Sequence, residues 1–185
     1  NHYTEWDGVT NYTTMFGQAL SVSPVQMASA YQTLANEGVR LSPILVAGCQ
    51  DADGNLTAVP KSKPTQVVAP STANDVMFMM EKIVEQGGIG KATAVAGYRS
   101  AGKTGTAEIK EGSGYGQYYA ASFYGMAPVD NPRYAMGVMI YKPKKVWTNS
   151  MAAAAGYQKI LSQVLLANRV PPSTGKSLNL PTEWK

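Results

Sequence analysis

Apolar residues recur at helical spacing in three parts of the chain, and the clearest of the three begins after residue 23. Ser23 can cap a helix, and Pro24 suits the first helical position. Gln26 completes an S-x-x-Q capping box with Ser23. The apolar stripe that follows consists of Met27, Tyr31, Leu34 and Ala35. With Gly38 as its end signal, this segment predicts a helix over residues 24–37.

The same periodicity predicts two further helices. Ser71 can cap the first, which Gly87-Gly88 would end, and its apolar positions are Val76, Met80, Ile83 and Val84. Ser150 can cap the second, which runs to Asn168, and its apolar positions are Tyr157, Ile160, Leu161, Val164 and Leu165. Residues 1–16 have aromatic side chains and turn signals without a clear period. They predict a loop or a short helix packed on the domain.

Strand patterns occupy two regions. Residues 39–69 alternate short apolar runs, among them Ile44-Leu45-Val46 and Thr57-Ala58-Val59, with turn residues such as Asp53-Gly54-Asn55, which favours a small β-hairpin at the surface. Three later segments are rich in β-branched and aromatic residues: Thr104 to Ile109, Gln117 to Met126 and Arg133 to Tyr141. They predict a three-stranded antiparallel meander on which the last helix packs. The fold class expected is therefore α+β, an antiparallel sheet flanked by helices.

Composition limits the classes of protein to which this chain can belong. A chain of 185 residues fits one domain, and 44% hydrophobic against 15% charged residues permits an ordinary core. The net charge is only +4, without a sustained basic stripe, so no nucleic-acid partner is expected. No run approaches the roughly 18 to 20 apolar residues of a membrane span, and no signal peptide opens the chain. Because Asn1 and not methionine stands first, we expect a piece of a longer protein.

Few residues are available for catalysis by common routes. Cys49 is the only cysteine, which excludes an internal disulfide and a cysteine metal cluster, and its apolar surroundings predict a buried side chain. His2 is the only histidine, which argues against Ser-His-Asp catalysis and histidine metal sites. A hydrolase or transferase built on this chain would need lysine as its base.

One stretch, Gly97 to Glu108, combines a lysine with three glycines and three small hydroxyl side chains within ten residues. Gly97 to Thr104 matches the phosphate-binding pattern G-x-x-x-x-G-K-T, which would predict nucleotide and magnesium binding. That site needs a buried strand before it and a helix after it. Here a glycine-broken loop precedes the stretch, and the glycines among residues 105–116 cannot sustain a helix, so the NTPase interpretation is disfavoured.

Acyl transfer is the second interpretation. Lys103-Thr104-Gly105 is the K-T-G element of penicillin-binding proteins and serine β-lactamases, here extended to K-T-G-T-A-E with Gly102 before it. The segment Gly17 to Gly38 matches the block G-x-x-x-x-V-T-P-x-Q-x-A…A-Y…A-N-x-G, with serine for threonine at position 23 and Glu37 for a small residue. The chain thus resembles the monofunctional class B penicillin-binding proteins. A plain exposed hairpin with a turn glycine is the alternative for the K-T-G segment.

The resemblance implies roles for four residues. Lys103 would support the acid–base network around a nucleophilic serine, and the hydroxyls of Thr104 and Thr106 would hold the terminal carboxylate of the substrate. The backbone N–H of Thr106 would serve as an oxyanion-hole donor. Gly105 removes a side chain where an extended peptide substrate would lie against the strand. The expected catalytic residues are therefore Lys103 and Thr106, and the expected substrate-binding residues are Lys103, Thr104, Gly105 and Thr106.

The nucleophile of this family is not found in the chain. The family needs S-x-x-K and S-x-N upstream of K-T-G, whereas the only matches are Ser100 to Lys103, Ser173 to Lys176 and Ser177 to Asn179. We interpret these as accidental, because an S-x-x-K serine opens a buried helix. The resemblance covers residues 12–170, the C-terminal half of the transpeptidase fold, with the last three strands of five. We expect a transpeptidase portion over residues 1–170 and a surface tail over 171–185. An isolated chain is expected to dimerise, exchange strands or be marginally stable.

By resemblance, the parent protein is a peptidoglycan D,D-transpeptidase without a cofactor or metal, and this fragment alone is inactive. Its expected partners are D-Ala-D-Ala stem peptides, β-lactams, the N-terminal part of the same domain and cell-wall synthesis proteins. The expected location is the extracytoplasmic face of the bacterial membrane, with an N-terminal anchor outside this chain. The alternatives are a non-catalytic peptidoglycan-binding module and a fragment of a serine β-lactamase or D,D-carboxypeptidase, which the V-S-P-x-Q helix disfavours. Roles in cell division and in cell shape both stay open.

Overall fold

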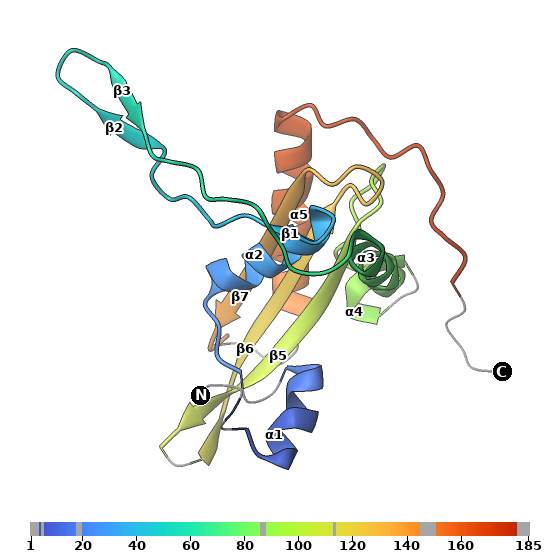
Figure 1. Ribbon diagram of the computed structural model, residues 1–185. Coiled ribbons are helices and arrows are strands. Elements are labelled where there is room, and N and C mark those ends of the chain that lie inside the picture. The colour runs from blue at the N-terminus through green and yellow to red at the C-terminus, as the bar shows by residue number, and fades with distance from the viewer. Residues whose placement is uncertain are drawn as a thin grey trace.

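A three-stranded antiparallel sheet forms the centre of the molecule (Figure 1). The computed structural model describes residues 4, 6–17, 20–85, 88–112, 114–144 and 151–180. The sheet has the order β5-β6-β7, with β5 at Ala101–Glu111, β6 at Gly114–Ala127 and β7 at Tyr134–Tyr141. The predicted meander is confirmed, although β5 begins at Ala101 and not at Thr104. Its last strand, β7, pairs only with β6 among the described residues.

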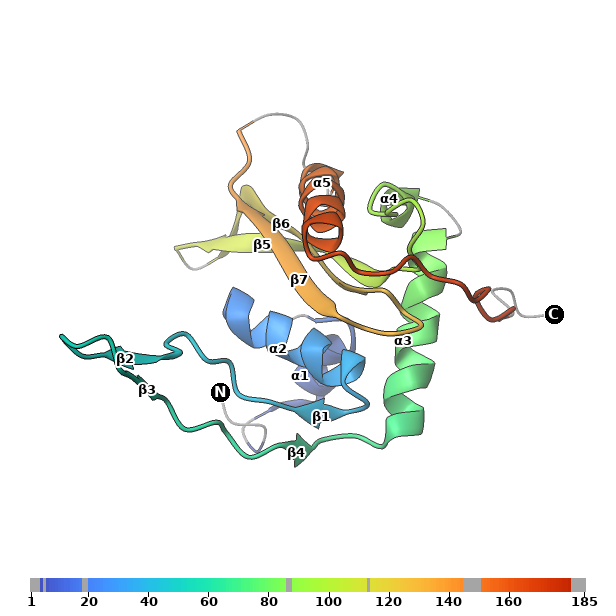
Figure 2. The same cartoon turned by 90° about the horizontal axis from the view of Figure 1, so that it is seen from above.

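Helices cover both faces of this sheet (Figure 2). Helix α5 (Met151–Ala167) packs on one face against β6 and β7, and α2 (Pro24–Ala35) packs on the other face against the same two strands. Helix α3 (Pro70–Glu85) contacts β5, and the short α4 (Gly88–Lys91) follows it. The predicted α+β class, an antiparallel sheet flanked by helices, is confirmed.

Two aromatic side chains on β6 organise the two cores. Successive residues of a strand point to opposite faces, so Phe123 and Tyr124 enter different clusters. Phe123 packs edge-to-face on Tyr157 of α5, with ring centroids 4.6 Å apart. Tyr124 lies beside Tyr31 of α2, with ring centroids 5.8 Å apart. Each helix is thereby fixed to its own face of the sheet, and the predicted packing of the last helix on the meander is confirmed.

The start of α2 is set by its own sequence. The Gln26 N–H donates to Ser23 Oγ over 3.2 Å, and the Ser23 N–H donates to Gln26 Oε1 over 2.8 Å. Both bonds of the predicted capping box are therefore present, with Pro24 at the first turn. The helix ends at Ala35, two residues before the predicted end. Gly38 follows with φ +80°, a conformation that favours glycine.

The apolar faces predicted for the other two helices are confirmed in part, with Tyr157, Leu161 and Leu165 of α5 and Val84 of α3 buried. Helix α3 begins at Pro70, so Ser71 lies within it and does not cap it, and its buried residues are Ala73, Met77, Glu81 and Val84. Helix α5 buries Ala153, Ala154, Tyr157, Leu161 and Leu165, whereas Ile160 is 47% exposed. The predicted cap Ser150 lies outside the described residues. On α3, Val84 is buried and Met80 packs against a core cluster as predicted, whereas Val76 and Ile83 are only partly buried and the acidic Glu81 occupies a core position.

An arm extends from the body between α2 and α3 (Figure 1). At its base β1 (Val39–Arg40) pairs with β4 (Thr65–Gln66), and at its tip β2 (Gly48–Gln50) pairs with β3 (Leu56–Ala58). The predicted hairpin is confirmed, but its first strand lies at 48–50 and not at 44–46. Cys49 is exposed, so its predicted burial was wrong. The reason is that, among the described elements, β2 and β3 pack only on each other, although the neighbouring sequence is apolar.

The N-terminal segment forms the short helix α1 (Gly8–Thr13) and a 3-10 turn, η2 (Thr14–Phe16). A short helix was predicted, but the expected packing on the domain was wrong. Its exposed apolar side chains are Val9, Tyr12, Met15 and Phe16, each at least 69% accessible. Within the part of the chain that the structure describes, no helix has the length and apolar character needed to cross a membrane.

Candidate active site

The K-T-G segment lies near the start of β5, on an edge of the sheet. Among the described residues, β6 is the only strand that pairs with β5. The strand continues unbroken from Ala101 to Glu111, so no helix opens after Thr104. A phosphate-binding loop requires that helix for its anion site, and the NTPase interpretation is therefore wrong.

Strand register divides the segment between the two faces of the sheet. Lys103 pairs with Tyr124 and Thr104 pairs with Phe123, and directly paired residues share a face. Lys103 therefore lies on the face of α2 and α3, whereas Thr104 lies on the face of α5. The two residues are nevertheless in contact, because Lys103 Nζ donates to the Thr104 carbonyl over 3.1 Å and to Thr104 Oγ1 over 3.3 Å. A cation and a hydroxyl thus lie together on an accessible strand.

Two glycines of the segment are required by cross-strand packing. A Cβ added at Gly102 would collide with the Phe123 ring and the Tyr124 carbonyl. A Cβ added at Gly105 would lie 2.6 Å from Ser122 Oγ, the side chain that donates to the Gly105 carbonyl over 3.4 Å. Gly105 therefore makes room for Ser122, a reason for glycine that the sequence did not reveal. Its predicted role in admitting a peptide substrate stays a prediction.

Substituting Gly105→Ala should destabilise the protein by about 1 to 3 kcal/mol, the usual cost of overpacking a filled site. Adding Ser122→Ala removes the side chain that the new Cβ would meet, so the double variant should recover most of that loss. Urea unfolding of both variants measures this.

Behind the segment, Arg99 joins β5 to α3. Arg99 Nε and Nη2 donate to the two carboxylate oxygens of Glu81 over 2.6 and 2.7 Å, and the Glu81 side chain is only 1% exposed. These hydrogen bonds raise the pKa of the Arg99 guanidinium above its ordinary value. A bidentate ion pair that is largely excluded from solvent fixes the relative orientation of its two side chains. It holds the residue four positions before Lys103 against α3.

The turn between β6 and β7 contributes Asp130 to the same region. Its carboxylate accepts from Ser173 Oγ over 2.6 Å and from the Thr174 N–H over 3.2 Å. Burial works to raise the pKa of Asp130, but these hydrogen bonds and the Arg99 charge outweigh it and hold the pKa below the ordinary value. Sequence reasoning missed Glu81, Asp130 and Ser173. Of these three, only Glu81 has a signal in the sequence. It is an acidic residue at helical spacing from Ala73, Met77 and Val84, which are buried.

The accidental S-x-x-K matches do not open helices. Ser100 is 4% exposed and comes directly before β5, and Ser173 lies in the extended tail with its hydroxyl bonded to Asp130. Neither has a lysine one helical turn away, so neither is arranged as the family's nucleophile. His2 lies outside the described residues, and within those residues no group of three or more histidine, cysteine, aspartate or glutamate side chains could hold a metal ion.

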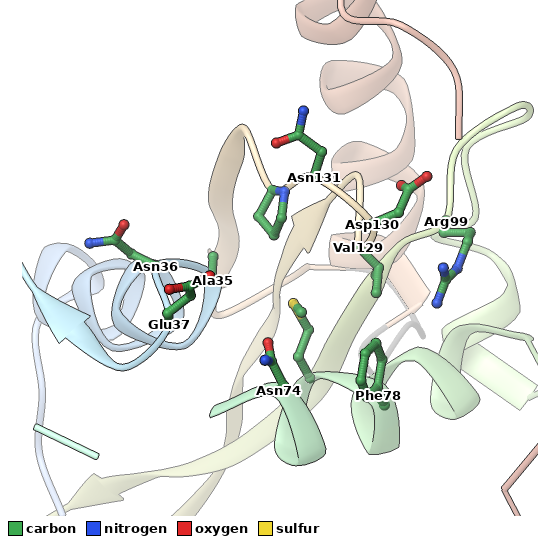
Figure 3. A pocket seen from close by; sticks show the side chains of 11 residues that line it. Ala35, Asn36, Glu37, Asn74, Phe78, Arg99, Val129, Asp130 and Asn131 are labelled. Carbon is green, nitrogen blue, oxygen red and sulfur yellow. The ribbon is translucent and has the colours of Figure 1, made fainter. Parts of the chain in front are cut away.

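A hollow of about 370 Å³ opens beside this network, between the end of α2, α3 and the β6–β7 turn. Figure 3 shows Asn74 and Phe78 of α3 facing Val129 and Asp130 of the turn, with Arg99 at one side. None of residues 103–106 lines it. A second, more apolar groove of about 560 Å³ runs between α2 and the base of the arm. Neither hollow contains the K-T-G side chains.

Comparison with known proteins defines the class to which this fold and this strand belong. Residues 2–165 match the model of the penicillin-binding protein transpeptidase domain. The chain therefore belongs to the penicillin-binding protein transpeptidase family, and the predicted family is confirmed.

Individual relatives narrow the resemblance to proteins of the PbpB and FtsI type. The chain is 35% identical to penicillin-binding protein PbpB of Mycolicibacterium smegmatis, over 95% of this chain and 29% of that protein. It is 32% identical to peptidoglycan D,D-transpeptidase FtsI of Escherichia coli, over 90% of this chain and 27% of that protein. The structure also resembles a crystal structure of penicillin-binding protein 3 from Mycobacterium tuberculosis complexed with ampicillin, with a TM-score of 0.86 and 34% identity. The alignment covers 98% of this chain and 43% of that chain. The chain spans less than a third of the length of these curated relatives.

Proposed function

We propose that this chain is the C-terminal part of the transpeptidase domain of a peptidoglycan D,D-transpeptidase that is acylated by β-lactams. The observation that carries the proposal is the K-T-G segment on an edge strand, where Lys103 Nζ lies 3.3 Å from Thr104 Oγ1. The likeness to penicillin-binding protein 3 structures complexed with ampicillin and with aztreonam supports it.

In the proposed reaction, a serine supplied by the preceding part of the domain attacks the carbonyl between the two D-alanines of a stem peptide. The terminal D-alanine leaves, an acyl-enzyme forms, and an amine of a neighbouring stem peptide then resolves it. The Lys103 ammonium supports the acid–base network around that serine. The hydroxyls of Thr104 and Thr106 bind the terminal carboxylate, and the Thr106 N–H polarises the scissile carbonyl. None of these groups is the nucleophile.

The proposal requires a partner segment, the N-terminal part of the same domain. Two features support this partner: β7 has a free outer edge among the described strands, and the groove beside α2 is largely apolar. The same proposal places the domain on the extracytoplasmic face of the bacterial membrane, anchored by a segment that precedes Asn1. There it would act with other cell-wall synthesis proteins in division or in elongation.

Labelling the source cells with fluorescent penicillin tests this proposal. The protein is captured with an antibody raised against residues 173–185, and excess ampicillin added before the label serves as the control. We expect a labelled, membrane-associated band much larger than this chain, whose label the ampicillin prevents. An unlabelled band of this chain's own size would contradict the proposal and favour the alternative, a peptidoglycan-binding module without turnover.

A further inference from the structure

The guanidinium, the N–H and the carbonyl of Arg99 each make a hydrogen bond, and each partner comes from a different part of the chain. The guanidinium is bonded to Glu81 of α3. The Arg99 N–H donates to Ser173 Oγ over 3.0 Å, and the Arg99 carbonyl accepts from the Val129 N–H over 2.9 Å. Arg99 comes two residues before β5 begins. The point at which the chain enters the K-T-G strand is therefore fixed by a helix, a turn and the C-terminal segment together.

Ser173 is the residue of the C-terminal segment that links these contacts. Its hydroxyl accepts from the Arg99 N–H and donates to Asp130 Oδ1, so one side chain joins the strand entry to the β6–β7 turn. Its own N–H donates to the Gly97 carbonyl over 2.9 Å. Close by, Tyr98 Oη donates to the Val170 carbonyl over 2.7 Å. The segment from Val170 to Ser173 thus bonds to three consecutive residues ahead of β5.

The residues between α4 and β5 are turns and irregular backbone. Thr93 and Val95 are buried, but Gly97, two residues before Arg99, has φ +82°, in the left-handed region. On its outer side, β5 has no strand partner among the described residues. The family match ends at residue 165, so it includes none of the segment that contains Ser173. The C-terminal segment is thus a third support for the start of β5, beside α3 and the β6–β7 turn.

We propose that Ser173 is a positioning residue for the K-T-G strand: by tying the Arg99 backbone to Asp130, it sets where Lys103 and Thr104 lie. Lys103 is four residues beyond Arg99, roughly 13 Å along an extended strand, and a displacement of about 1 Å can cost on the order of a hundredfold in rate. The catalytic part of this inference rests on the proposed function. The structural part rests on the hydrogen bonds alone.

The test compares Ser173→Ala, Ser173→Thr and Ser177→Ala in the complete protein. Ser177 is a matched control, because its hydroxyl accepts from Lys82 of α3 and does not contact the strand entry. We expect Ser173→Ala to lower the acylation rate at saturating fluorescent penicillin by about tenfold. The Ser173→Thr variant, which keeps the hydroxyl, should recover to within about twofold of the unsubstituted protein, and Ser177→Ala should stay within the same range. Rescue by threonine separates positioning from a general loss of stability.

Amide hydrogen exchange over residues 98–106 provides a second readout that does not require activity. Faster exchange there in Ser173→Ala, but not in Ser177→Ala, supports the positioning role. If the unsubstituted protein is not acylated, the proposed function fails, and the exchange experiment still decides whether Ser173 orders the strand. Unchanged exchange together with unchanged acylation in Ser173→Ala overturns the inference.

Discussion

Substituting Arg99→Met should lower the free energy of unfolding of the transpeptidase domain by about 3 to 5 kcal/mol, the typical cost of removing one partner of a buried ion pair. The Glu81 side chain is 1% exposed and receives two hydrogen bonds from Arg99. Methionine fills similar space but donates nothing, so the buried carboxylate would lose both of these hydrogen-bond donors. Urea unfolding of the complete domain at neutral pH measures the loss.

A double variant shows whether this loss comes from the unpaired charge. Replacing both residues, Arg99→Met with Glu81→Leu, removes the carboxylate as well as its partner. Buried pairs replaced by apolar residues of similar volume are often neutral in stability, so the double variant should recover most of what Arg99→Met loses. A double variant as unstable as the single one would mean that the packing of the Arg99 side chain, and not the charge of Glu81, was decisive.

Substituting Lys103→Ala should slow acylation by penicillin by about 10² to 10⁴-fold, the range in which a positioned acid–base group contributes. The reason is that, in the proposed reaction, the substitution removes the ammonium group that lies against Thr104 on the edge strand and supports the acid–base network of the serine. Folding should be little affected, because Lys103 is exposed. Stopped-flow measurement with a fluorescent penicillin gives the rate.

Lys142→Ala is the matched control for this substitution. Lys142 also lies beside the sheet, where its ammonium bonds to Glu111 over 3.1 Å, and both side chains are more than a third exposed. Solvent screens an exposed pair of this kind, so its loss should leave the acylation rate unchanged. Equal rates for Lys103→Ala and the unsubstituted protein would remove Lys103 from the mechanism.

Local signals in the sequence predicted the elements that depend on local physics. The capping box at Ser23 and Gln26 fixed the start of α2, since both of its hydrogen bonds join residues three apart. The aromatic and β-branched runs predicted the meander, and the K-T-G element predicted the edge strand. Cys49 shows the limit of this reasoning. Its neighbours are apolar, but burial needs a second layer, and no pattern within a hairpin reveals whether one exists.

The network behind the candidate site could not be predicted, because its partners are distant in sequence. Arg99 is 18 positions from Glu81 and 74 from Ser173, and Asp130 is 43 positions from Ser173. Periodicity reports on neighbours within a turn or two, so it cannot pair such residues. The division into residues 1–170 and a surface tail stays a prediction. The hydrogen bonds from Val170 and Ser173 to residues 97–99 cross that boundary.

The exposed arm carries a thiol to which a fluorescent dye can be attached. Cys49 is the only thiol in these 185 residues, and it lies on the outer hairpin, remote from the sheet that bears the K-T-G segment. A maleimide dye attached there would leave both cores and the K-T-G strand untouched. Paired with a fluorescent penicillin as acceptor, it would report the distance between the arm and an acylated site by energy transfer, without a cysteine having to be introduced in this part of the protein.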